Sequence, residues 1–212
     1  MGGKYWALSA EQFRPRPFSG RKALEKAQND LKINSEAFGR RSGLLHGQKT
    51  QPLCDMYYGK YSLGWNGCEI IAAANVMEMC GLPQYFPQVI FEFELNRMHY
   101  IFPSGYWGTS PKRLGRFFSA HGLSFKRIFP EKEFVQNSAG GKHSCGIVSF
   151  WNNKKSDHGA DFFSGGLHTV AYRYDNGKYL VYNLYGRDTS PREVESIAEV
   201  FSDRRFIVGY VF

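Results

Sequence analysis

Three residues of types used in thiol catalysis occur in sequence contexts that would let them act together. Cys68 stands at the start of a segment rich in helix formers, where unpaired backbone amides and the positive end of a helix dipole favour a thiolate. His168 opens an expected strand, and Asn183 closes the strand that pairs with it. This combination predicts nucleophilic attack by sulfur, with His168 as the general base and Asn183 orienting its ring.

Each of these residues taken alone is more often structural: a buried thiol, a hydrogen-bonded strand histidine or a turn asparagine. Their conjunction is what points to catalysis. Asn66, just before the cysteine, adds an amide donor that suits an oxyanion hole, or alternatively the N-cap of the expected helix.

The elements that would position these residues follow from hydrophobic spacing and turn signals. Helices are expected over residues 20–34, 68–80, 88–98, 110–122 and 193–200. Strands are expected over residues 145–151, 168–174, 179–183 and 205–212. The turn Asp175-Asn176-Gly177 predicts a hairpin that brings His168 close to Asn183. Because most helices precede the strands, the expected fold class is α+β with an antiparallel sheet.

The sequence resembles the papain-like cysteine peptidases, in particular the peptidase C39-like branch, over residues 54–212. The matching segments are YSLGWNGCEIIAAANVMEMCG, SPKRLGRFFSAHGL, CGIVSFW and GGLHTVAYRYDNGKYLVYN. The resemblance implies a papain-like fold, with an N-terminal helical lobe, a C-terminal antiparallel sheet lobe and the active-site cleft between them. It also implies a Cys68–His168–Asn183 triad that hydrolyses peptide or amide bonds through a thioester acyl-enzyme.

The sequence departs from the family pattern on both sides of the cysteine. Ser62 stands where the family has a glutamine, and Gln48 and Gln51 would reach the site only through a rearranged loop. The usual Gly-Pro is replaced by Glu69-Ile70, and a carboxylate beside a thiolate opposes its ionisation unless it points away. Two alternatives therefore stay open: an inactive or binding protein on the same fold, and a Cys-dependent amidase, deamidase or acyltransferase.

The chain of 212 residues, with 42% hydrophobic residues and a net charge of +8, has the size of one large domain. Its basic character is concentrated in residues 1–50, which hold ten Lys and Arg against four Asp and Glu. We expect this segment to be an extension docked on the catalytic domain, residues 51–212, with a propeptide crossing the cleft as the alternative. The segment is also a candidate contact for an anionic partner.

Composition and spacing exclude several classes of function. No apolar run is long enough for a membrane span, and the N-terminus lacks the pattern of a signal peptide, so a cytoplasmic location and export after processing both remain compatible. No nucleic-acid-binding motif is present. The four cysteines form neither a CxxC pair nor a zinc-binding spacing, so we expect no metal, no cofactor and no disulfide framework. The expected partner is a peptide or protein substrate.

Overall fold

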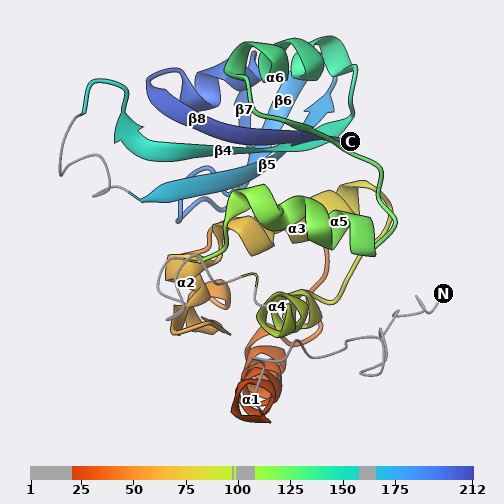
Figure 1. Cartoon of the computed structure of the whole chain (residues 1–212), viewed down its shortest axis with the longest axis vertical. Coiled ribbons are helices and arrows are strands. Elements are labelled where there is room, and N and C mark those ends of the chain that lie inside the picture. The colour runs from red at the N-terminus through yellow and green to blue at the C-terminus, as the bar shows by residue number, and fades with distance from the viewer. Residues whose placement is uncertain (1–20, 97, 99–107, 158–165) are drawn as a thin grey trace.

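The computed structural model describes residues 21–96, 98, 108–157 and 166–212, and it combines helices with a six-stranded antiparallel sheet (Figure 1). The helices are α1 (Arg21–Phe38), α2 (Leu63–Asn66), α3 (Cys68–Met79), α4 (Phe86–Leu95), α5 (Leu114–Ala120) and α6 (Glu131–Ser138). Short 3-10 helices are η1 (Leu53–Asp55), η2 (Pro111–Arg113), η3 (Ala139–Gly141) and η4 (Ile197–Phe201). The strands are β1 (Tyr57–Tyr58), β2 (Tyr61–Ser62), β3 (Lys126–Ile128), β4 (Cys145–Lys154), β5 (Leu167–Asp175), β6 (Lys178–Tyr182), β7 (Arg192–Val194) and β8 (Arg204–Val211). The α+β class is confirmed.

The large sheet has the strand order β3-β8-β4-β5-β6-β7, and β1 and β2 form a separate hairpin. Strands β5 and β6 pair in an antiparallel register around the turn at Asn176 and Gly177, whose φ angles are 49° and 87°. Two consecutive residues with positive φ make the tight turn that suits the twist of a hairpin. The predicted hairpin between His168 and Asn183 is therefore confirmed.

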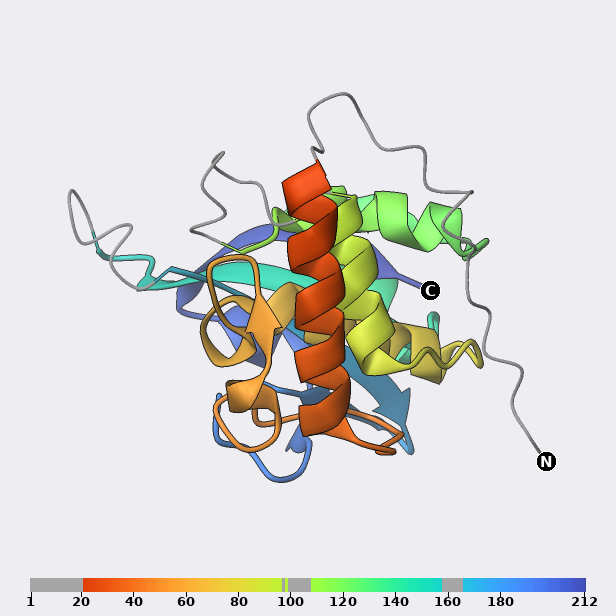
Figure 2. The same cartoon turned by 90° about the horizontal axis from the view of Figure 1, so that it is seen from below.

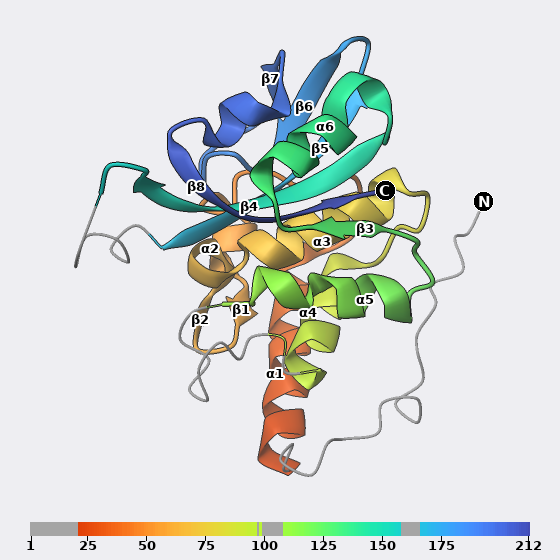
Figure 3. The same cartoon turned by 45° about the horizontal axis from the view of Figure 1, so that its top comes forward.

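Helices cover both faces of this sheet, with α6 on one face and α3 and α5 on the other (Figure 3). Because side chains alternate along a strand, Ile147 and Ala171 join the core under α3, whereas Val148 and Val170 join the core under α6. Burial on both faces explains why β4 reads as a nearly continuous apolar run.

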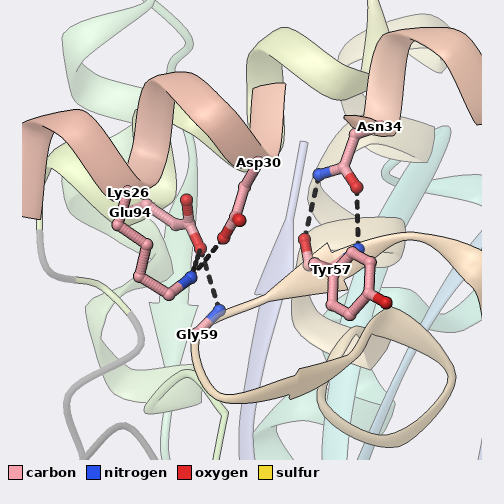
Figure 4. A network of polar contacts seen from close by, with 6 residues as sticks. All are labelled: Lys26, Asp30, Asn34, Tyr57, Gly59 and Glu94. Atoms are coloured by element: carbon pink, nitrogen blue, oxygen red, sulfur yellow. Dashed lines mark hydrogen bonds and ion pairs between the residues drawn. The ribbon is translucent and has the colours of Figure 1, made fainter. Parts of the chain in front are cut away.

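Helix α1 packs beside α4, on the far side of α3 from the sheet (Figures 1 and 2). Polar contacts supplement this packing (Figure 4). Asn34 exchanges two hydrogen bonds with the backbone of Tyr57, at 2.9 and 2.7 Å. Glu94 of α4 accepts a hydrogen bond from the backbone N–H of Gly59 at 2.9 Å, and Lys26 lies 3.7 Å from the same carboxylate oxygen. Residues 21–38 are thus a packed part of the body, whereas residues 1–20 of the predicted extension lie outside the described residues.

The predicted elements differ from the structure on both sides of residue 122. The helix expected over residues 193–200 is confirmed only in part: residues 197–201 form η4, whereas β7 pairs with β6 as an edge strand. A capping box formed by Ser196 and Glu199 starts η4 beyond the strand. The helix expected over residues 110–122 is divided into η2 and α5. Elements that were not expected include η1, β1, β2, α2, β3 and α6. Among the described residues, no helix is both long and apolar enough to cross a membrane.

The docking of α1 depends on Phe38, which is 2% exposed and packs against the rings of Tyr85 and Phe86. We expect Phe38→Ala to lower the free energy of unfolding by about 3–5 kcal/mol, because it leaves a cavity between α1 and α4. Leu24→Ala is the matched control on the same helix, since Leu24 is 42% exposed and its loss should change stability by less than about 0.5 kcal/mol. Urea unfolding measures the free energy of unfolding of both variants. An equal loss of stability in the two variants would contradict the docking of α1.

Candidate functional site

A cavity of about 560 Å³ brings together residues from distant parts of the chain. Its walls come from the loop before η1, from α2 and the start of α3, from the start of β5 and from the loop after β6. Five residues predicted to be functional or considered for the site line it: Gln48, Asn66, Cys68, Glu69 and His168. Packing between α3 and β5 places the starts of these two elements at the same cavity.

Cys68 is the first residue of α3 and is 6% exposed. Its sulfur donates a hydrogen bond to Oε2 of Glu69 at 3.3 Å. Burial and the neighbouring Glu69 carboxylate raise the pKa of the Cys68 thiol well above its usual value, although backbone hydrogen bonds from Thr169 and Glu69 act in the opposite direction. The lowered pKa expected for a cysteine at a helix start is therefore not found, and the resting site holds a protonated thiol.

Glu69, whose carboxylate was expected to oppose ionisation of the thiol unless it pointed away, points towards Cys68. It is 2% exposed, and Oε1 accepts a hydrogen bond from Thr169 at 3.4 Å. The hydroxyl of Thr169 also contacts that of Ser149 at 2.9 Å, across the pairing of β4 and β5. Burial raises the pKa of Glu69 to about 7. The sequence signal was a hydroxyl residue in each of the two paired strands, Ser149 within the run CGIVSFW and Thr169 near the start of β5, because buried hydroxyl groups need polar partners.

His168 is partly buried near the start of β5, and its ring packs edge-on against Phe150 with centroids 5.8 Å apart. Nε2 lies 2.8 Å from the backbone oxygen of Asn183. A carbonyl oxygen only accepts hydrogen bonds, so Nε2 carries the proton and Nδ1 holds the basic lone pair in the neutral ring. Burial lowers the pKa of His168, so the ring is neutral at pH 7.

Asn183 orients this ring in a different way from the one predicted. Within the described residues its side chain hydrogen-bonds to Gln48 and not to His168: Oδ1 accepts from the backbone N–H of Gln48 at 3.0 Å, and Nδ2 donates to Oε1 of Gln48 at 2.9 Å. Gln48 also donates from Nε2 to the backbone oxygen of Gly64 at 2.9 Å. Asn183 has a φ of 60°, a conformation that asparagine tolerates better than most residues. The backbone of Asn183 thus holds His168, and its side chain holds Gln48.

The structure places Cys68 and His168 at one cavity without bonding them to each other. Within the described residues, no hydrogen bond joins the sulfur to the imidazole ring. Successive strand side chains point to opposite faces, and Thr169 is directed towards Glu69 on the α3 face. His168 instead contacts Phe150, a member of the core on the other face.

Asn66 is the last residue of α2, and the alternative that it serves as the N-cap of α3 is wrong because Gly67 occupies that position. The side chain of Asn66 lines the cavity next to Cys68. Its Nδ2 is buried and makes no hydrogen bond within the described residues. Leaving a buried amide donor unpaired costs about 1–3 kcal/mol, which makes this group a candidate for binding an acceptor in the cavity.

The described residues contain no group of three or more His, Cys, Asp or Glu side chains that could hold a metal ion. Comparison of the whole chain with models of known protein families gives no match, and no curated protein matches it.

The contact between Glu69 and Cys68 predicts how thiol reactivity depends on pH. We expect Glu69→Gln to lower the pKa of Cys68, because it removes a negative charge next to the thiolate. One pKa unit gives roughly tenfold more thiolate, so alkylation of Cys68 by iodoacetamide should be roughly tenfold faster at about pH 8. Since the pKa of Glu69 is about 7, the advantage should fade towards pH 5.5 or so, where the wild-type carboxyl is also neutral.

Glu78→Gln, at the far end of the same helix, is the control and should leave the rate unchanged. Slower alkylation in Glu69→Gln than in the wild type would contradict this interpretation and would make Glu69 the acceptor that activates the thiol.

Proposed function

We propose that this chain is a papain-like thiol hydrolase that cleaves peptide or amide bonds, with Cys68 as nucleophile and His168 as general base. The observation that carries the proposal is a helix-start thiol and an oriented neutral imidazole lining the same cavity. The resemblance of the sequence around Cys68 and His168 to the papain-like peptidases supports it. The helices on one side of the sheet and the strands themselves would correspond to the two lobes of that fold.

In the proposed reaction, the Cys68 sulfur attacks the substrate carbonyl carbon while His168 accepts the thiol proton at Nδ1. This step requires the thiol to leave its contact with Glu69 as substrate enters, and it requires the sulfur and Nδ1 of His168, which form no hydrogen bond with each other within the described residues, to come within hydrogen-bond distance. The oxyanion is held by the backbone N–H of Cys68 and by Nδ2 of Asn66, the unpaired donor of the cavity. His168 then protonates the leaving amine, and water hydrolyses the thioester to release the acid and regenerate the thiol.

Exposed aromatic rings at the cavity give it the means to bind extended peptide. Trp65 is 69% exposed and Tyr185 is 53% exposed, and both line the cavity. Rings of this size supply contact area for substrate side chains at a small entropic cost. Lys49 and Arg204, also in the lining, add positive charge that would favour acidic segments.

The nucleophile can be tested without knowing the natural substrate, by using p-nitrophenyl acetate. We expect the wild-type protein to release a burst of p-nitrophenolate and to carry an acetyl group on Cys68, detected by peptide mapping. Cys68→Ala should abolish the burst, and His168→Ala should slow acylation by about 100-fold or more. Cys54→Ala is the matched control, because Cys54 is a partly exposed thiol outside the cavity.

A burst that survives Cys68→Ala, or that disappears in Cys54→Ala, would contradict the proposal. Glutamine-containing peptides then distinguish the type of reaction: new amino termini indicate proteolysis, whereas ammonia release without cleavage indicates deamidation.

A second candidate is a binding protein without catalysis, and the hydrogen bond from Cys68 to Glu69 favours it. A thiol whose pKa is raised, and which donates a hydrogen bond to a neighbouring carboxyl group, is a poor nucleophile because little of it is ionised. In that case the unpaired amide of Asn66 and the exposed rings would bind a peptide that is not cleaved. Absence of acetylation in the wild type, together with saturable peptide binding, would select this function.

A further inference from the structure

Two of the cysteines that lie outside the cavity, Cys80 and Cys145, lie against each other. Cys80 is the C-cap of α3, and Cys145 is the first residue of β4. Their sulfur atoms are 3.7 Å apart, although the two residues are 65 positions apart in the sequence. Both are free thiols in the structure.

This pair differs in its surroundings from the other two thiols. Cys54 and Cys68 each contact the carboxylate of the residue that follows them. Cys80 and Cys145 instead share a hydrogen bond with each other, which lowers the pKa of Cys80 and raises that of Cys145. The sulfur with the greater tendency to ionise is also the more accessible one, because Cys80 is partly exposed and Cys145 is 2% exposed.

We propose that Cys80 and Cys145 form a reversible disulfide, a modification site that reacts with small-molecule disulfides such as oxidised glutathione. A disulfide requires a sulfur separation of about 2.0 Å, so the two sulfur atoms must approach each other by roughly 1.7 Å to form the bond. The bond would connect the end of the helix that begins at Cys68 to a central strand of the sheet.

The reaction proceeds in two exchanges. The Cys80 thiolate attacks one sulfur of oxidised glutathione, forms a mixed disulfide and releases one glutathione thiolate. Cys145 then loses its proton, attacks the Cys80 sulfur and displaces the second glutathione thiolate. Two protein thiols are oxidised by two electrons, one glutathione disulfide is reduced, and the two protons end on the two glutathione molecules.

The test uses the full chain with Cys54→Ser and Cys68→Ala, so that only the proposed pair remains. After incubation with oxidised glutathione, we expect intact mass spectrometry to show the loss of two hydrogen atoms and no retained glutathione. Dithiothreitol should restore both thiols to alkylation. Adding Cys145→Ser should trap glutathione on Cys80, because the resolving thiol is absent, whereas adding Cys80→Ser should leave the buried Cys145 unmodified.

Peptide mapping of the oxidised wild-type chain tests the same link without any substitution, and should find the peptides of Cys80 and Cys145 joined. A glutathione adduct that persists on Cys80 when Cys145 is present would overturn the proposal. So would two thiols that both stay open to alkylation after the oxidant treatment.

Discussion

Reciprocal hydrogen bonding between Gln48 and Asn183 is the interaction on which the arrangement of the cavity depends. It joins the loop that follows α1 to the end of β6, and Gln48 extends the connection to Gly64 of α2. Both side chains are buried, so breaking the pair would leave amide groups unpaired at about 1–3 kcal/mol each. The pair thereby fixes Asn183 in its left-handed conformation, and the carbonyl of Asn183 in turn holds the ring of His168.

Burial decides the protonation states around this framework. The low-dielectric surroundings favour neutral forms, which raises the pKa of Cys68 and of Glu69 and lowers that of His168. A helix start favours a thiolate at Cys68, but the adjacent carboxyl group and the loss of solvent oppose it more strongly. The resting site consequently consists of a thiol bonded to Glu69 and a neutral imidazole bonded to a carbonyl. Under the proposed function, substrate binding must release the thiol from Glu69.

The elements that depend on local signals could be predicted from the sequence, and the contacts between distant segments could not. The turn at Asn176 and Gly177 requires positive φ at consecutive residues, and it was correctly predicted to connect a hairpin. The apolar run CGIVSFW was correctly predicted to be a strand. Gln48 was not predicted as the partner of Asn183, because the two residues are 135 positions apart and the sequence does not indicate which residue an amide side chain will bond. The direction of the Glu69 side chain was also not predicted, since it depends on which hydroxyl groups of the two strands fold against α3.

The orientation of the His168 ring is the central claim, and nitrogen NMR of the imidazole in the wild-type protein tests it most directly. The bond from Nε2 to the carbonyl of Asn183 predicts the tautomer protonated at Nε2, with Nδ1 as the basic nitrogen. Burial predicts that the ring titrates below the usual histidine pKa of about 6.5. A ring protonated at Nδ1 at neutral pH, or one that titrates above that value, would contradict this orientation and with it the proposed role of His168 as a general base.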